Sequence, residues 1–227
     1  MLTKQQIEDN RKTFISILRS VDRAGCDIEA LINKLDSAGF FYSPASTKWH
    51  SNFEGGLCLH SLNVYNTLLN LVKQWYTNEI TDNGGTRFLR EGDFHSIDSN
   101  SIIITGLLHD VCKMNFYEQY FRNEKKYSTT GSKHDEQGNF DWVSKSDYRI
   151  KASNERFLYS THGHNSEYIV GTYIPLTFEE SVAIVNHMGK TSEVDLTDQS
   201  AIYSAHPLAT LLHAADYVST FLLEVVE

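Results

Sequence analysis

The fold of this chain is decided by the stretch Ser101-Ile-Ile-Ile-Thr-Gly-Leu-Leu-His-Asp-Val-Cys-Lys113. Its apolar run predicts a helix in the protein core. His109 and Asp110 stand at the end of that helix, and both side chains are costly to bury unless something pairs with them. Because adjacent helical residues project about 100° apart, one metal ion can take both side chains, or the carboxylate can bridge two metals. Lys113 follows one turn later, where a cation can hold a phosphate.

Other candidate metal ligands are spread along the chain, each on, or at the entrance of, a predicted apolar helix. They follow the order His…His-Asp…His…His…Asp, which fits a metal-ligand set better than chance polarity in a core. The candidates outside the central stretch are His60, His162, His164, His187 and Asp216.

With these motifs the chain resembles the HD-domain metal-dependent phosphohydrolases, over roughly residues 40 to 225. The ligand order is that of the two-metal branch of the superfamily. The approach to the first ligand, Pro44-Ala-Ser-Thr-Lys-Trp-His-Ser-Asn-Phe-Glu-Gly-Gly-Leu-Cys-Leu-His60, is similar to bacterial and phage HD hydrolases and to the HD part of bacterial 3′-5′ exoribonucleases. The resemblance implies an all-α fold, an HD-domain helical bundle, into which the local sequence pattern described below inserts a β-hairpin near the active site.

The resemblance also implies which histidine of the third region is a ligand. In the family, a His-Gly pair is followed by a small residue three positions later, as in His162-Gly163 with Ser166. His162 is therefore the expected ligand, and His164 takes a position that is often acidic in relatives. That departure leaves His164 either as a neighbour of the ligands or as a substrate contact.

The resemblance implies a centre of two divalent metal ions. Its metal ligands would be His60, His109, Asp110, His162, His187 and Asp216. Imidazole and carboxylate together suit Mn, Fe, Co, Ni or Zn, and Mg can also serve. Asp110 would bridge the metals or orient the attacking hydroxide, and is the expected catalytic residue together with Lys113.

Four residues are candidate substrate contacts. Lys113 either binds phosphate or complements the helix dipole. Arg122, on the predicted hairpin, either meets phosphates or belongs to a solvated strand face. His50 matches a histidine of the exoribonuclease relatives that lies near the leaving group, and His164 is the fourth candidate.

Length, charge and composition narrow the function. With 227 residues the chain can bury a full core. Its net charge of −9 and the lack of a basic stripe favour a small nucleotide substrate over duplex DNA or long RNA. No apolar run reaches the roughly 18 residues of a membrane span. Three scattered cysteines predict reduced thiols in a cytoplasmic protein. The oligomeric state stays open, with a homo-oligomer as one option.

The local patterns predict two parts. Residues 1–40 form an N-terminal helical hairpin packed on the core, and residues 41–227 form the HD domain as a single globular unit. Within it, residues 116–150 lose the helical period and predict a β-hairpin that covers the site. Residues 81–100 and 195–205 are expected to be loops.

The expected function is that of a divalent-metal-dependent phosphohydrolase or phosphodiesterase, cleaving a phosphoester of a cyclic or linear nucleotide by metal-activated hydroxide. Two alternatives stay open. Some HD proteins use the same ligand order for a di-iron centre that oxidises C–H bonds with oxygen. The other alternative is a module that binds a nucleotide without turnover. A protein that only binds has no need of the complete set of metal ligands.

Overall fold

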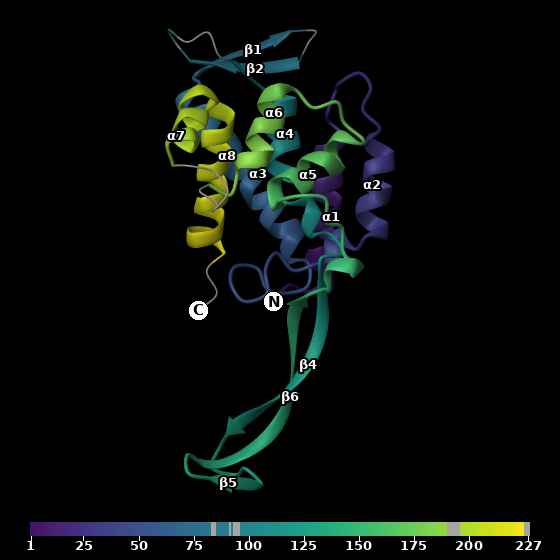
Figure 1. Ribbon diagram of the computed structural model, residues 1–227, viewed down its shortest axis with the longest axis vertical. Coiled ribbons are helices and arrows are strands. Elements are labelled where there is room, and N and C mark those ends of the chain that lie inside the picture. The colour runs from purple at the N-terminus through teal and green to yellow at the C-terminus, as the bar shows by residue number, and fades with distance from the viewer. Residues whose placement is uncertain (83–84, 91, 93–95, 190–195, 225–227) are drawn as a thin grey trace.

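The computed structural model describes residues 1–227 except 83–84, 91, 93–95, 190–195 and 225–227. It consists of a body of packed helices, a small sheet against one end of that body and a long β arm that projects from the other end (Figure 1). The metal-ligand candidates of the sequence belong to the helical body.

The N-terminal helices pack on the core through aromatic rings. Helix α1 (Lys4–Leu18) begins with a capping box, in which Thr3 and Gln6 each bond the other's backbone N–H. Helix α2 (Ile28–Ser37) and the short 3₁₀ helix η1 (Phe40–Tyr42) follow. Phe14 of α1 lies 5.2 Å from the Phe40 ring, so the N-terminal segment shares one hydrophobic cluster with the central helices.

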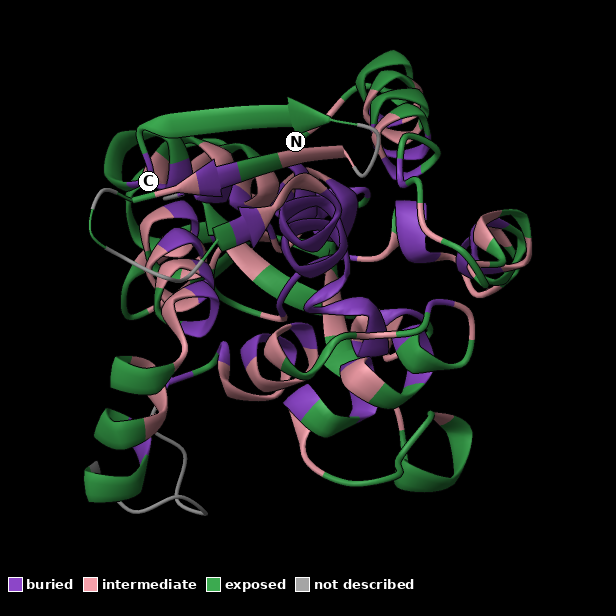
Figure 2. Cartoon of the chain, turned by 90° about the horizontal axis from the view of Figure 1, so that it is seen from above, coloured by how far each residue is buried: buried purple, intermediate pink, exposed green. Residues whose placement is uncertain are grey.

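The centre of the body is helix α4 (Ser99–Leu108), of which every residue from Asn100 onward is buried. Figure 2 shows this concentration of buried residues at the centre of the body. Helix α3 (Gly56–Trp75) packs along α4, and Gly106 permits the close approach, because a Cβ there would lie 2.8 Å from the Cα of Tyr65. The 3₁₀ helix η2 (Val111–Lys113) directly follows α4.

The remaining helices close around α3 and α4, and α6 and α8 pack against each other. They are the 3₁₀ helix η3 (Ser153–Glu155), α5 (His162–Gly171), α6 (Phe178–Asn186), α7 (Leu196–Ala205), α8 (Pro207–Val218) and the π-helical η4 (Ser219–Leu223). The loop expected over residues 195–205 was wrong, because α7 occupies most of it. No helix within the described part of the chain combines the length and apolar character that crossing a bilayer requires.

The prediction of an all-α fold was wrong. Of the described residues, 52 % are helical and 19 % lie in strands, which form two three-stranded antiparallel sheets. The first sheet, in the order β1-β2-β3, falls largely in the segment expected to be a loop. Its strands are β1 (Asn78–Asp82), β2 (Gly85–Leu89) and β3 (Ser96–Asp98). Only Phe88 and Ile97 bury their side chains, and they pack on the ends of the helices.

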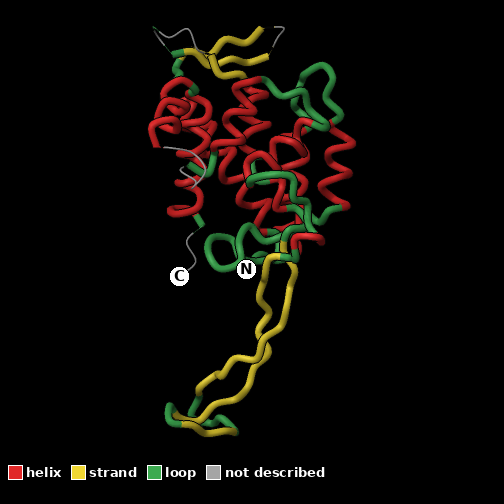
Figure 3. The backbone as a smooth tube through the Cα atoms, in the orientation of Figure 1, coloured by secondary structure: helices red, strands yellow, loops and turns green. Residues whose placement is uncertain are grey.

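The second sheet is the arm. The β-hairpin predicted between residues 116 and 150 is present: β4 (Tyr117–Tyr127) pairs with β6 (Gly138–Ile150), and β5 (Lys133–Asp135) adds a short third strand at the tip. The expectation that the hairpin covers the site was wrong, because the arm leaves the helical body and projects away from it (Figure 3). Only its root, at Tyr117, lies close to the candidate site.

Candidate metal centre

Asp110 is the centre of a buried cluster that four histidines approach from four directions. It stands between α4 and η2, and its carboxylate lies 2.5 Å from Nε2 of His162 and 3.4 Å from Nε2 of His187. Nε2 of His60 lies 3.6 Å away and Nε2 of His109 lies 3.7 Å away. Helices α3, α4, α5 and α6 thus each direct one imidazole nitrogen at a single carboxylate.

Main-chain carbonyls set the orientation of two of the rings. Nδ1 of His109 lies 3.0 Å from the carbonyl oxygen of Gly106, and Nδ1 of His187 lies 2.6 Å from that of Ile184. A carbonyl only accepts, so each Nδ1 carries the proton, and each Nε2 offers a lone pair to the cluster. Nε2 of His187 is buried and makes no hydrogen bond with any described residue, as expected of a nitrogen reserved for a metal.

His60 is held by carboxylates on both sides. Its Nδ1 lies 3.1 Å from Oε1 of Glu224, and its Nε2 lies 3.3 Å from Oδ1 of Asp216. Burial disfavours the charged imidazole, but the hydrogen bonds to Asp216 and Glu224 outweigh it and raise the pKa of His60 to about 10. A carboxylate on Nδ1 is the usual support of a metal-binding histidine, and a cation at Nε2 would replace the proton there.

His162 is supported by a thiol and by a glycine. Its Nδ1 lies 3.2 Å from Sγ of Cys112, while its Nε2 faces Asp110. Gly163, the next residue, has no room for a side chain, since a Cβ there would lie 2.2 Å from the carbonyl oxygen of Val185. This contact brings α5 against α6 and places the ring of His162 5.2 Å from that of His187.

The charges of the cluster fit a divalent cation. Burial opposes ionisation of Asp110 and Asp216, yet the neighbouring cations and histidines hold the pKa of both carboxyls well below the usual range. The pKa of Glu224 is lowered in the same way, through its hydrogen bond with His60. Lys113, whose Nζ donates to Asp110 over 2.6 Å, lies with His60 among three carboxylates. The side chains that could hold an ion form three overlapping groups among the described residues: His109 with Asp110 and His187, His60 with His109 and Asp216, and His50 with His60 and Glu224.

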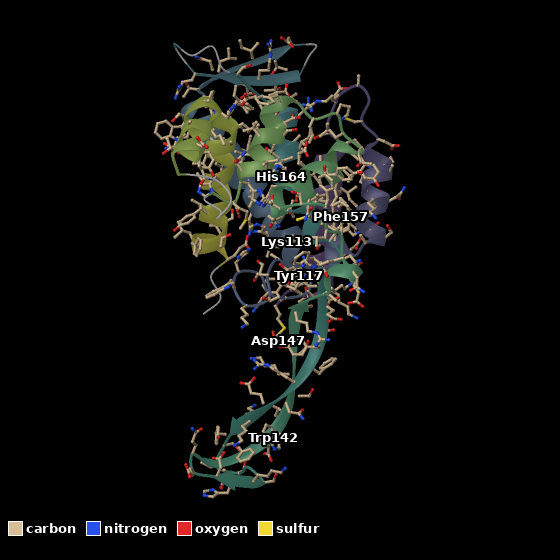
Figure 4. The ribbon with its side chains drawn as sticks, in the orientation of Figure 1. Lys113, Tyr117, Trp142, Asp147, Phe157 and His164 are labelled. Carbon is tan, nitrogen blue, oxygen red and sulfur yellow. The ribbon has the colours of Figure 1, made fainter. Side chains whose placement is uncertain are left out.

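The remaining predicted contacts lie at different distances from the cluster. The His50 ring is 4.9 Å from that of His60, and neither of its nitrogens has a hydrogen-bond partner among the described residues. Burial lowers the pKa of His50 to about 4, so it stands neutral beside the cluster. His164 is exposed and bonds Thr161. Arg122 lies on the arm, 3.1 Å from Asp147, so the structure does not bring it to the site (Figure 4).

Glu224 is the part of the site that the sequence reasoning missed. It stands after the last apolar helix, in Leu222-Leu-Glu224, where a lone glutamate resembles an ordinary surface residue. In the structure it is buried and also accepts hydrogen bonds from Ser51, at 2.6 Å, and Asn63, at 2.9 Å. Cys112, expected only as a core thiol, is the second missed contact. No local sequence pattern predicts the contact of Glu224 with His60 or that of Cys112 with His162, because each contact joins segments distant in sequence.

Comparison with known proteins adds no information to this geometry. No protein-family model matches the chain, and no curated protein and no solved structure matches it either.

Proposed function

We propose that the chain is a divalent-metal-dependent phosphohydrolase that cleaves a phosphoester bond of a nucleotide, as its resemblance to the HD-domain hydrolases implies. One observation carries the proposal: four imidazole Nε2 atoms lie within 3.7 Å of the carboxylate of Asp110. A cluster of this kind, buried and with its rings fixed through Nδ1, suits metal ligation better than core packing.

Two metal ions sharing Asp110 account for the whole set. His109, His162 and His187 would hold one ion with Asp110, and His60 with Asp216 would hold the second. None of these ligands is a thiolate, which favours Mn, Fe, Co, Ni or Zn, with Mg as a further option. Such ions would polarise a phosphoryl oxygen and lower the pKa of a coordinated water.

The chain's own residues would bind and orient the substrate. Lys113 has a side chain only 13 % exposed and already faces Asp110, so its charge remains at the cluster when an anion binds. A phosphate beside it would form a charge-assisted hydrogen bond in a site with little water. His50, neutral and with both nitrogens open, supplies a donor or acceptor on the side of His60.

The substrate class follows from charge. A net charge of −9 disfavours the long phosphate backbone of RNA or DNA, so we propose a mononucleotide or a short cyclic or linear oligonucleotide.

Cys26, Cys58 and Cys112 are all free thiols, which supports a place in the reducing cytoplasm.

The test is chromatography of a nucleotide panel after incubation with the protein and Mn²⁺, with bound metal measured in the same sample. The panel holds mononucleotides, nucleoside triphosphates, cyclic dinucleotides and short RNA. Products that form with the native chain and vanish with Asp110→Ala support hydrolysis and identify the bond. Protein that holds two metals and turns over nothing would reject the proposal. Oxygen consumption with bound iron would then favour the di-iron alternative, and tight nucleotide binding without products would favour sequestration.

A further inference from the structure

The arm has two chemically different faces. Residues that pair across β4 and β6 share a face, and alternate pairs point to opposite sides. One side, which we call the aromatic face, carries Phe121, Tyr127, Phe140, Trp142, Tyr148 and Ile150. Its other positions on these two strands are one further tyrosine and the neutral residues Gln, Asn and Ser, and its single charge there is Lys125. At the tip, β5 adds Lys133 and Asp135 to the same side.

The opposite side of the arm is a solvated face whose charges satisfy one another. Arg149 lies 2.7 Å from Glu118, and Arg122 lies 3.1 Å from Asp147. Lys145 continues the row, 3.4 Å from a carboxylate oxygen of Glu124. Such a ladder of cross-strand ion pairs needs no partner. Any surface that the arm offers to another molecule is therefore on the aromatic face.

The aromatic face is uncovered in the middle of the arm, while Phe140 at the tip is buried against its neighbours. Phe121 is 70 % exposed and Trp142 is 48 % exposed. No helix of the described residues lies on the arm, which projects from the body with Trp142 near its far end (Figure 4). A two-stranded ribbon without a covering layer is marginally stable in water, and an amphipathic one is stabilised when its apolar side is buried. This distribution of residues indicates a covering layer that the described part of the chain does not supply.

The charge of the chain and of the aromatic face indicates which molecule would cover that face. The chain carries a net charge of −9, so contact between two copies through most of its surface brings acidic groups together. Along β4 and β6 the aromatic face avoids this cost, because the one cation there, Lys125, is already held by Asp135, and Lys133 lies only at the tip. A neutral face of this kind matches itself across a twofold axis. The same lack of available cations makes it a poor track for nucleic acid.

We propose that the aromatic face of the arm binds the same face of a second copy and joins two chains into a dimer. The eleven register pairs, at about 3.3 Å each, make a surface about 35 Å long and roughly 10 Å wide. Two such faces bury on the order of 700 Å² in total, below the 1,200 Å² of a standard interface. The dimer is therefore weak and depends on concentration.

The experiment is sedimentation velocity of the full chain from about 1 to about 300 µM, a range that brackets a weak dimer. Phe121→Lys and Trp142→Lys place charge on the aromatic face. Val143→Lys is the matched control, because Val143 neighbours Trp142 on the strand, is 37 % exposed and points to the charged side. Circular dichroism and metal content confirm that each variant is folded.

We expect the native chain and Val143→Lys to form dimers over this range, and each aromatic-face variant to dimerise at least about tenfold more weakly. Metal content and turnover should be equal in all four proteins, since the arm lies away from the cluster. A native chain that stays monomeric at the highest concentration overturns the proposal, as does a Val143→Lys variant that loses dimer equally. Binding of a labelled single-stranded oligonucleotide by monomeric protein, lost in Phe121→Ala, would assign the face to nucleic acid instead.

Discussion

At the scale of single residues, Asp110 is the side chain on which the candidate centre depends, because all four imidazoles face its carboxylate. Replacing it with Asn removes the charge and keeps the shape. We expect Asp110→Asn to lose at least half of the bound metal and all measurable hydrolysis. Metal analysis after dialysis against limiting Mn²⁺ measures the first effect.

The matched control for that change is His164→Ala, since His164 is exposed and bonds only within its own turn, to Thr161. The control should retain its metal. If His164→Ala loses as much metal as Asp110→Asn, the ligand assignment is wrong and the third region supplies the other histidine.

The second prediction at the scale of single residues concerns Glu224. Glu224→Gln keeps a hydrogen-bond acceptor but removes the charge beside Nδ1 of His60. Loss of such a supporting carboxylate weakens metal binding about 10- to 100-fold. A titration with a competing chelator measures the change. Glu179→Gln, which alters a surface glutamate 2.8 Å from His206, is the control and should leave metal affinity unchanged.

The metal ligands that the sequence predicted share one property: each is a polar group on, or at the end of, a helix of the body. His109 and His187 could be found in this way because an unexplained polar side chain in a core demands a partner. Glu224 could not, since its burial comes from contact with Ser51 and His60, more than 160 positions earlier. The prediction that Arg122 contacts the substrate was wrong for a different reason. A basic residue on a solvent-facing strand does not indicate in which direction the hairpin projects.

At the scale of elements, the contact between α5 and α6 sets the spacing of two candidate ligands. Gly163→Ala adds a methyl group where a Cβ meets the carbonyl oxygen of Val185 at 2.2 Å. The helices must separate, at a cost of about 1–3 kcal/mol in unfolding free energy. Gly171→Ala, on the same helix with nothing within 4 Å, should be neutral or slightly stabilising. Urea unfolding of both variants measures the difference, and equal stabilities would contradict this account of the contact.

Helix α6 is also tied to the N-terminal segment through Glu180. Its carboxylate is fully buried, accepts from Arg23 at 2.6 Å and bonds Ser101 of α4. Burial opposes ionisation, but the hydrogen bonds from Arg23 and Ser101 hold the pKa of Glu180 below its usual value. Because the folded pKa is lowered, this pair stabilises the fold above the unfolded pKa of about 4.3 and loses its effect as pH falls through the folded value.

We therefore expect Glu180→Gln to cost about 2–4 kcal/mol at pH 7, and less as the pH falls below about 4. Thermal unfolding of both proteins between pH 3 and pH 7 measures the difference. A gap that stays constant over this range would show that the charge of Glu180 is not responsible for the stabilisation.

The sheet β1-β2-β3 shows what the sequence could not predict at this scale. Every residue of β1 is exposed, so Asn78–Asp82 has no alternation of apolar and polar side chains. A strand without a buried face resembles a loop, and only its pairing with β2 distinguishes the two. Helix α7 was missed in the same way, because Asp195–Ala205 is mostly polar. The arm was predicted correctly as a hairpin, since the segment loses the helical period, is rich in aromatic residues and contains Gly131 and Gly138 at turns.

At the scale of the whole molecule, the candidate centre joins helices from most of the chain, so metal binding should stabilise the entire helical body. A metal at 100 times its dissociation constant adds about 2.7 kcal/mol to the folded state. For a chain of this size that raises the melting temperature by about 5–10 °C. Calorimetry with Mn²⁺ and with a chelator measures the shift. Asp110→Asn should show little of it, and an equal shift in that variant would place the metal elsewhere.

The order of the groups along the chain has a further consequence during synthesis. His60 emerges early, but Asp216 and Glu224, which hold it on both sides, are translated much later, Glu224 by 164 positions. A ribosome-bound chain can collapse its central helices before these carboxylates leave the exit tunnel. It cannot yet assemble the complete cluster. Cation capture is thereby deferred until residue 224 has left the exit tunnel, and a product that stops short of residue 224 should remain metal-poor however well its core has formed.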